Sequence, residues 1–476
     1  MGAPDPCHIV DSRFHGGGYA TGATRAIFGD RARLQRWLDV EVALARSQAE
    51  LGIIPTAAAA EIERRAIVDR LDLRSVAGGI HRTGHSIVPL LGALRSACDG
   101  DAGEWIHFGA TTQDIQDTAQ SLEMGAVLDA LVPQVDAVIR RLAQGCRLHR
   151  DQLMVARTHS VAALPTTFGL KMAGWLDELS RQRDRLVSAR PRILVAQLFG
   201  GAGTMAALGS RAVELLERFS ARLGLTAPST AWHVARDRMA EYVHLLAMVS
   251  ATAARIADEI RTLNRNEIGE VEIGWSAHQV GSSTMPHKRN PEACEQVVAL
   301  ARLTKAQVPL ALDAMVLEHE RDYRGTRLEW CAVADASHYS VAALTMLDDV
   351  IASLTVHGET MAGRAFDCRE ALCTEAFVFA LAQCRGKETA YRLVREISQR
   401  SQDQGNSFSE LLCHHPGVIE ALGGPQAVER LLDPRNHLGA HGELIDRVLR
   451  SAESPPPLTV VDSPPVHDVR RAVGQD

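Results

Sequence analysis

The chain has 476 residues, 46% of them hydrophobic, and a formal net charge of -7, the composition of an ordinary globular protein with a large core. Lysine and arginine form no sustained run, so we expect neither nucleic acid nor an anionic membrane surface as a partner. The N-terminus lacks an apolar signal segment and no stretch of about 18 apolar residues occurs, so we expect a cytoplasmic protein.

Helices are the predicted elements, because only 4% of the residues are aromatic and aliphatic residues dominate. Apolar residues recur at helical spacing in 31–51 and in 122–148, where Pro133 predicts a kink rather than a break. Further long helices are predicted at about 168–189, 233–267, 291–319 and 331–357. Long helices joined by short links predict a bundle in the middle of the chain.

The lengths of the predicted helices and the positions of turn residues divide the chain into three helical domains and a tail. We predict an N-terminal domain at 1–120, a central bundle at 121–365 and a C-terminal domain at 366–452. Shorter helices broken by turns such as the one before Pro416 mark the C-terminal domain. The proline-rich residues 453–476 predict an unstructured tail. The expected fold class is all-α.

A glycine-rich stretch at 193–206 contains GxGxxA after an apolar run, a weak match to a dinucleotide-binding turn. No second strand ending in an acidic residue follows about 20 residues later, and the flanks are helical, so a turn between helices is favoured over NAD binding. The adjacent Cys413, His414 and His415 seldom face one ion. We therefore expect no cofactor and no metal.

The most informative string is GSSTMPHKRNP, at residues 281–291. Glycine and two serines make a flexible turn, and Pro291 can begin the next helix. Lys288 and Asn290 supply a cation and an amide near that helix start, where backbone N–H groups also bind anions. Such a turn can enclose a carboxylate and leave a serine hydroxyl free to reach the adjacent carbon. Taken alone, these pieces are also typical of a polar loop between helices.

The whole string resembles the signature loop GSSxMPxKxNP of the aspartase/fumarase superfamily at every fixed position. By this resemblance Ser282 is the general base, and Ser283, Met285, Lys288 and Asn290 contact the substrate. The resemblance also implies three helical domains whose central bundles pack into a homotetrameric core. It further implies active sites composed of segments from different subunits.

Residues 107–118, HFGATTQDIQDT, are similar to the HxGxTSxDxxDT pattern of the adenylosuccinate lyase branch, with a threonine in place of the serine. The paired hydroxyls of Thr111 and Thr112 can donate to a substrate carboxylate, and Asp114 can orient a partner histidine. Taken alone, the segment is typical of a helix N-terminus capped by threonine, with acidic residues in its first turn.

Residues 157–169, RTHSVAALPTTFG, resemble the RTHxxxAxPTTFG stretch of the same branch, and His159 falls on its catalytic histidine. An imidazole suits that role because it gains or loses a proton near neutral pH. His85 lies where the branch has a second active-site histidine, although Ser86 replaces the acid that follows it there. Which of the two histidines donates a proton to the leaving group stays open.

The segment 318–330, EHERDYRGTRLEW, bears on the substrate class. Adenylosuccinate lyases have here a serine-rich stretch and an arginine that bind the nucleotide phosphate, whereas this chain lacks the serine pair and has Trp330 at the arginine position. The Glu-Trp pair is similar to the carboxymuconate cycloisomerase branch. We expect a small di- or tricarboxylate substrate, with Arg321, Arg324 and Arg327 as candidate anion contacts. Arg324 and Arg327 are equally typical of solvated or interface residues.

The expected reaction is β-elimination from a succinyl-type substrate, giving fumarate and a nitrogen leaving group. Proton removal beside a carboxylate builds negative charge on it, so the site must gather cations and N–H donors there. Because the superfamily includes specialised lyases of secondary metabolism, the resemblance makes release of nitrite from nitrosuccinate the sharpest candidate. Adenylosuccinate lyase and 3-carboxy-cis,cis-muconate cycloisomerase activities are the alternatives. A catalytically silent scaffold is disfavoured because Ser282, Lys288 and His159 are intact.

Overall fold

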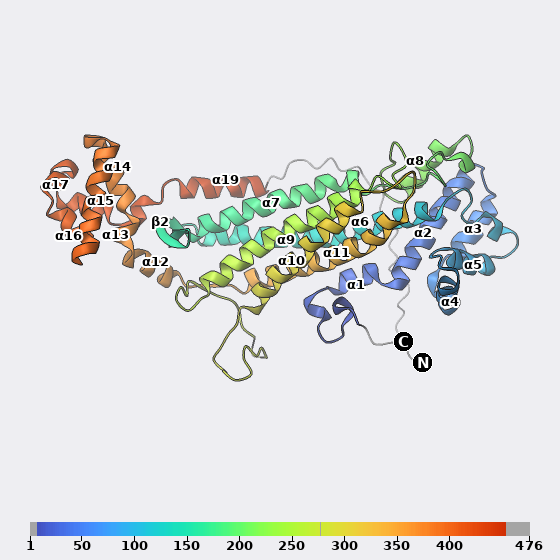
Figure 1. Cartoon of the computed structure of the whole chain (residues 1–476), viewed down its shortest axis with the longest axis horizontal. Coiled ribbons are helices and arrows are strands. Elements are labelled where there is room, and N and C mark those ends of the chain that lie inside the picture. The colour runs from blue at the N-terminus through green and yellow to red at the C-terminus, as the bar shows by residue number, and fades with distance from the viewer. Residues whose placement is uncertain (1–6, 277, 454–476) are drawn as a thin grey trace.

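The structure is a computed structural model that describes residues 7–276 and 278–453, and its frame is a bundle of long helices (Figure 1). The bundle consists of α6 (Thr112–Leu148), α7 (Phe168–Ile193), α9 (Asp237–Leu263), α10 (Glu292–Asp313) and α11 (Tyr323–Ala352). At 1.5 Å per residue, the 37 residues of α6 extend over about 55 Å. The two ends of the bundle are therefore far apart. We call them the α2 end and the α12 end, after the helices that lie beside them.

Aliphatic side chains fill the bundle, as the low aromatic content predicts. In α6, Leu128, Leu131, Val135 and Leu142 recur at helical spacing and are fully buried. The helix continues through Pro133, as predicted. It begins earlier than the predicted start at 122, because Thr111 and Asp114 form a capping box that starts it at Thr112.

The N-terminal part of the chain packs at the α2 end, where it shares one hydrophobic core with the bundle. The predicted helix at 31–51 is confirmed as α2, and its Leu38 and Leu44 are buried. The helices of this region are α1 (Gly22–Phe28), α2 (Asp30–Glu50), α3 (Thr56–Arg65), α4 (Leu73–Thr83) and α5 (Val88–Ala97), with α8 (Ala212–Arg222) beside α2. Short 3-10 helices of the chain lie at Ile9–Asp11, Gly16–Gly18, Val68–Arg70, Ala102–Trp105, Ala206–Leu208 and Pro434–His437.

Two small antiparallel pairs of strands lie at the α12 end. Strands β1 (Leu153–Thr158) and β2 (Val161–Thr167) form a hairpin between α6 and α7. Its turn residues, His159 and Ser160, have φ values of 52° and 67°, the left-handed conformation that tight two-residue hairpin turns require. Strands β3 (Val271–Glu272) and β4 (Thr355–Val356) join the segment after α9 to the segment after α11.

The C-terminal part begins beside the hairpin and has a small hydrophobic core of its own, with Phe377 and Leu412 at its centre. Its helices are α12 (Gly358–Asp367), α13 (Arg369–Leu372), α14 (Thr374–Arg385), α15 (Lys387–Gln404), α16 (Phe408–Cys413), α17 (Pro416–Leu422) and α18 (Pro425–Leu431). The last helix, α19 (His441–Glu453), returns along α7, and its Ile445 and Leu449 belong to the main core.

The predicted range 366–452 thus covers two packing environments, and the predicted domain boundaries stay predictions. The predicted unstructured tail from 453 onward lies, beyond its first residue, outside the described residues. The fold class is all-α, as expected. Among the described residues, no helix is both long and apolar enough to cross a membrane.

Candidate active site

The GSSTMPHKRNP segment lies in the connection between β3 and α10, which projects from the bundle as a long loop at the α12 end (Figure 1). The two ends of the segment cross at Gly281. Its carbonyl accepts a hydrogen bond from Asn290 Nδ2 at 2.5 Å, and a Cβ atom on it would lie 2.1 Å from the carbonyl oxygen of Lys288. Only glycine fits at this crossing, and the hydrogen bond from Asn290 holds the two ends of the segment together.

Ser282 follows the crossing and is half-buried. Its Oγ accepts the backbone N–H groups of Met285 at 3.0 Å and Thr284 at 3.3 Å. Donors directed at a hydroxyl oxygen stabilise negative charge on it, which favours loss of its proton. Ser283, Met285 and Lys288 are exposed on the same loop, where they can meet a ligand.

His159 is exposed at the tip of the β1–β2 hairpin. The hairpin is joined to the base of the serine loop by Arg157, whose guanidinium contacts both oxygens of the buried Glu270 at 3.1 and 2.6 Å. Glu270 directly precedes β3, and the serine loop follows β3. The hairpin and the serine loop therefore rise from the same end of the bundle.

Thr111 lies at the other end, where it caps α6, and Thr112 begins that helix. Arg321 donates to Thr111 Oγ1 at 2.7 Å and to the carbonyl oxygens of Gly200 at 3.0 Å and Gly201 at 2.6 Å. We call Thr111, Gly200, Gly201 and Arg321 the Thr111 cluster. It combines a hydroxyl and a guanidinium, the groups that bind a carboxylate. The glycine-rich stretch thus forms a turn between helices, as predicted, and supports this cluster.

Asp114 is fully buried beneath the Thr111 cluster. Its Oδ2 accepts the backbone N–H groups of Thr111 at 3.0 Å and Gly200 at 2.9 Å. Its Oδ1 accepts the N–H of Phe199 at 2.9 Å and lies 3.1 Å from His233 Nε2. The histidine that Asp114 contacts is thus His233, which lies outside the three motif strings. It follows a tryptophan just before α9, and the sequence around it contains no motif that indicates a role.

A second buried group of charges lies one turn further along α6. Arg236, before α9, bonds Asp117 at 2.7 and 3.0 Å and Glu329 Oε1 at 2.8 Å, and all three side chains are fully buried. Burial opposes the charge on Arg236, yet Asp117 and Glu329 raise its pKa above the ordinary value. Since breaking a buried pair leaves an uncompensated charge, this triad fixes the starts of α6, α9 and α11 relative to one another.

His85 lies near the same end of α6. It is half-buried, and its Nδ1 accepts the N–H of Val88 at 3.4 Å. The adjacent Ser86 accepts a hydrogen bond from Gln116 Nε2, in the first turns of α6, at 2.6 Å. His85 is therefore on the side of the Thr111 cluster, away from His159.

The three candidate arginines of the 318–330 segment differ in their contacts. Arg324 Nε donates to Asp322 Oδ2 at 2.8 Å, and the hydrogen bonds from Arg324 lower the pKa of Asp322. The guanidinium of Arg324 also lies 3.3 Å from Glu318. Arg327 lies over the ring of Tyr323, 4.7 Å from its centroid, and 5.7 Å from the centroid of Trp330. Of the three arginines, only Arg321 contacts Thr111. At position 330, where adenylosuccinate lyases have a phosphate-binding arginine, this chain has a tryptophan that packs against other aromatic rings.

Trp330 belongs to an aromatic cluster between α11 and α2. Its ring lies 6.4 Å from that of Trp37 and 6.5 Å from that of Tyr323, and the guanidinium of Arg33 lies 5.8 Å from it. Arg33 is paired with Glu123 at 3.0 Å. The cluster is therefore a packed junction that holds the first turns of α11 against the N-terminal helices.

The predicted site residues thus form two groups at opposite ends of one chain. Thr111, Thr112, Asp114, His85 and Arg321 lie at the α2 end. The residues of the α12 end are His159, Ser282, Ser283, Met285, Lys288 and Asn290. Because α6 separates the groups by about 55 Å, a single chain cannot join them around one small substrate.

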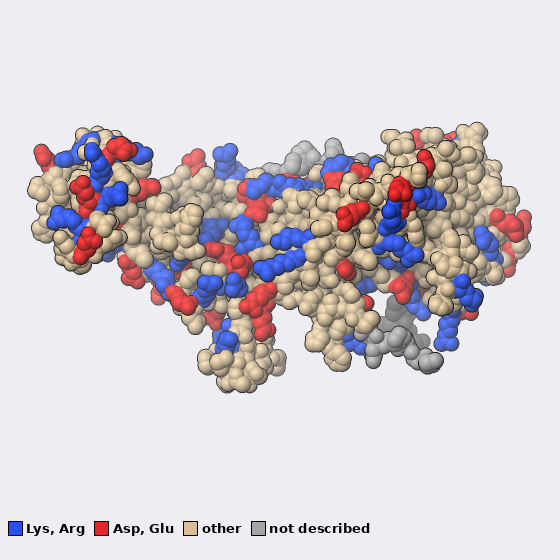
Figure 2. Space-filling view, in the orientation of Figure 1, with Lys and Arg blue, Asp and Glu red and all other residues tan. Residues whose placement is uncertain are grey.

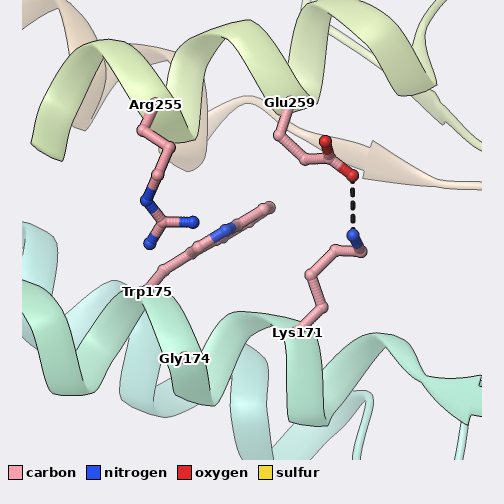
Figure 3. A pocket seen from close by; sticks show the side chains of 5 residues that line it. All are labelled: Lys171, Gly174, Trp175, Arg255 and Glu259. Carbon is pink, nitrogen blue, oxygen red and sulfur yellow. Dashed lines mark hydrogen bonds and ion pairs between the residues drawn. The ribbon is translucent and has the colours of Figure 1, made fainter. Parts of the chain in front are cut away.

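A hollow of about 230 Å³ lies between the first turns of α7 and the last turns of α9, at the α12 end of the bundle (Figure 3). Trp175 forms its floor, Lys171 Nζ lies 2.6 Å from Glu259 Oε1, and Arg255 is paired with Glu178 outside the hollow. Both cations are already neutralised, so the hollow offers no free charge to an anionic substrate. Figure 2 shows lysines and arginines interspersed with acidic residues on the visible face.

Comparisons with known proteins identify the family. A family profile described as a lyase matches residues 18–304, and one described as the adenylosuccinate lyase C-terminus matches residues 371–448. The N-acetyl-S-(2-succino)cysteine lyase of Dickeya dadantii is 36% identical, over 94% of this chain and 98% of its own length. This chain belongs to the aspartase/fumarase superfamily.

Two further comparisons cover about nine tenths of this chain. The 3-carboxy-cis,cis-muconate cycloisomerase of Pseudomonas aeruginosa is 34% identical, over 89% of this chain and 93% of its own length. The crystal structure of a fumarate lyase from Mesorhizobium sp. BNC1 superposes with a TM-score of 0.84 at 35% identity, and covers 90% of this chain and 98% of that one. This superfamily member is a lyase.

Proposed function

We propose that the protein catalyses β-elimination from a succinyl-type substrate and releases fumarate. The observation that carries the proposal is the environment of Ser282, whose hydroxyl oxygen accepts two backbone N–H groups beside the exposed Lys288. A serine in such a setting can lose its proton and then act as a base. The relative from Dickeya dadantii, named for a succino-substituted cysteine, supports a substrate of this class.

In the proposed reaction the alkoxide of Ser282 takes a proton from the carbon next to a carboxylate. Lys288 and Asn290 hold that carboxylate while negative charge develops on it. The electron pair of the broken C–H bond forms the new double bond, and the leaving group departs with the electrons of its own bond to carbon. The other carboxylate binds to Thr111, Thr112 and Arg321, a hydroxyl pair and a guanidinium suited to it.

The composite site requires several copies of the chain, and we propose a homotetramer. The separation of the two groups of site residues supports it, because each active site must then take its halves from different subunits. Apolar side chains are also exposed on α10 and on the turn after it, where another copy can cover them. These side chains are Leu303, Leu312, Met315 and Val316.

The leaving group is the finer part of the proposal. The sequence favours a nitrogen leaving group, with nitrite from nitrosuccinate as the first candidate. The likeness to the Dickeya enzyme favours a thiol as the second. An amine or a thiolate gains from a proton donated by His159 or His85, whereas nitrite is a stable anion that needs only hydrogen bonds.

The reverse reaction identifies the leaving group. The protein is incubated with fumarate and one of ammonia, nitrite, an amino acid, AMP or N-acetylcysteine, and separately with 3-carboxymuconate; Ser282→Ala is the control. We expect one nucleophile to give an adduct and the control to give none. If the protein converts carboxymuconate and forms no adduct from fumarate with any nucleophile, the proposal is replaced by a cycloisomerase activity.

A further inference from the structure

We infer that His233 is a positioning residue for the carboxylate-binding half of the site, acting through Asp114. The inference rests on the proposed function, because it assigns the Thr111 cluster to a substrate carboxylate. His233 itself is 2% exposed and does not reach the cluster's open side. Its effect must therefore pass through the groups it contacts.

His233 is held once through its ring and once through its backbone. Nε2 lies 3.1 Å from Asp114 Oδ1, and the backbone carbonyl of His233 accepts a hydrogen bond from Gln113 Nε2 at 2.9 Å. Since an ionised carboxylate can only accept, Nε2 carries the proton in this contact. Both partners lie in the first turn of α6, so His233 couples the segment before α9 to the start of that helix.

Asp114 divides its acceptor capacity evenly between its two oxygens. Oδ1 receives His233 and the N–H of Phe199, while Oδ2 receives the N–H groups of Thr111 and Gly200. A carboxylate with two donors on each oxygen is held against rotation. If His233 ceases to donate, Oδ1 keeps only the N–H of Phe199, and the carboxylate is held less firmly against rotation.

Arg321 is the cation that shares these contacts. It donates to Thr111 Oγ1 and to the carbonyl oxygen of Gly200, and Asp114 binds the N–H groups of the same two residues. Gly200 has φ of 71°, a left-handed conformation that glycine adopts readily. Rotation of Asp114 would therefore displace two of the three groups that hold Arg321, and with them the charge offered to the substrate.

An isosteric pair of variants separates the donor from the packing. His233→Gln keeps an N–H donor, whereas His233→Met has similar length and none. His338→Leu is a matched control, because His338 is also a buried histidine with one hydrogen bond, Nδ1 to Thr24 Oγ1 at 2.9 Å, but lies further along α11. Melting temperature and sedimentation confirm that each variant is folded and assembled.

The first measurement is fumarate binding by calorimetry. We expect His233→Met to bind fumarate about 10 to 100 times more weakly than the wild type, the effect of misplacing a binding group by about 1 Å. His233→Gln and His338→Leu should stay within about threefold of it. Equal affinities for the Met variant and the wild type, or equal losses for Gln and Met, would overturn the inference.

The second measurement does not depend on any ligand. Amide hydrogen exchange of residues 199–205 should be faster in His233→Met than in the wild type and in His338→Leu, because the N–H groups of Phe199 and Gly200 lose a rigid acceptor. An unchanged amide exchange rate in His233→Met would by itself overturn the inference. A wild-type protein that binds no fumarate would count against the proposed function alone, and the exchange result would still decide on His233.

Discussion

At the scale of single residues, the site depends on where polar groups are left free and where they are already satisfied. Ser282 receives two N–H donors, whereas the guanidinium of Arg324 is occupied by Asp322 and Glu318. Within the part of the chain that the structure describes, Arg321 bonds only neutral groups, a hydroxyl and two carbonyl oxygens. Its full charge is therefore offered to a ligand, while that of Arg324 is cancelled.

Replacement of Ser282 by alanine tests the base. Because general base catalysis contributes about 10² to 10⁴ in rate, we expect Ser282→Ala to lower kcat by about 10³ while fumarate binding changes little. Fumarate formation is followed by its ultraviolet absorbance. Ser276→Ala, an exposed serine of the same loop, is the control and should keep its activity. A Ser282→Ala protein with more than about a tenth of wild-type kcat would exclude this serine as the base.

The two arginines make a matched pair. A charge-assisted hydrogen bond contributes about 1.5–3 kcal/mol, so Arg321→Ala should raise KM for the substrate about 10 to 100 times. Arg324→Ala should change KM by less than about threefold, because an exposed ion pair contributes little. Steady-state kinetics on both variants gives the comparison, and a larger effect at Arg324 would reverse the assignment.

At the scale of elements, the spacing of apolar residues predicted the helices that bury an aliphatic stripe. It did not predict elements in which apolar residues do not recur at a regular spacing. The start of α6 was predicted too late because its first turns bury mainly polar side chains, with Ile115 as the large apolar residue among them. The polar ones are Gln113, Asp114, Gln116 and Asp117. These side chains face the polar network, so the helix has no stripe there. The β1–β2 hairpin was missed because short apolar runs do not distinguish a strand from a buried helix.

The same limit applies to the candidate site. The three motif strings supplied Ser282, His159 and Thr111 because the residues of each string are adjacent in sequence. They could not supply His233 or Arg236, whose importance comes from contacts with α6 across the fold. Nor could they show that the strings lie at opposite ends of the bundle, because that depends on the direction in which each helix runs.

The junction of α2 with the turn before α6 gives a pH-dependent test. His107 Nδ1 lies 2.6 Å from the buried Glu41; burial would lower the pKa of His107, but the hydrogen bond and charge of Glu41 raise it above its ordinary value. A raised pKa in the folded state stabilises the protein fully below the unfolded value of about 6.5, and this stabilisation is lost as pH rises through the folded value.

Glu41→Gln should therefore lower the melting temperature more at pH 5.5 than at pH 9. Thermal melts of the variant and the wild type over that range measure the difference. His338→Leu serves as a control for buried histidines without a carboxylate partner, since its hydrogen bond goes to Thr24. A loss of stability that grows with pH would contradict the assigned direction.

At the scale of the whole molecule, the length of the bundle decides how the site can be assembled. The serine loop and His159 lie at the α12 end, and the Thr111 cluster lies at the α2 end, about 55 Å away along α6. When bundles of different subunits lie antiparallel, the α12 end of one meets the α2 end of another. The rigid helices then bring exposed loops together that no single chain could join.

Mixing of inactive subunits tests this assembly. Ser282→Ala chains and Arg321→Ala chains are assayed at a substrate concentration well below the KM of Arg321→Ala, where each is weakly active alone. Equal amounts of the two are then unfolded together and refolded. If each site takes its serine from one subunit and its arginine from another, random assembly leaves about a quarter of the sites with both native residues, and about a quarter of wild-type activity should return. Separately tagged chains prove that hybrids form. Hybrids that stay inactive would mean that serine and arginine come from the same chain, which the length of α6 forbids, or that they do not serve one site.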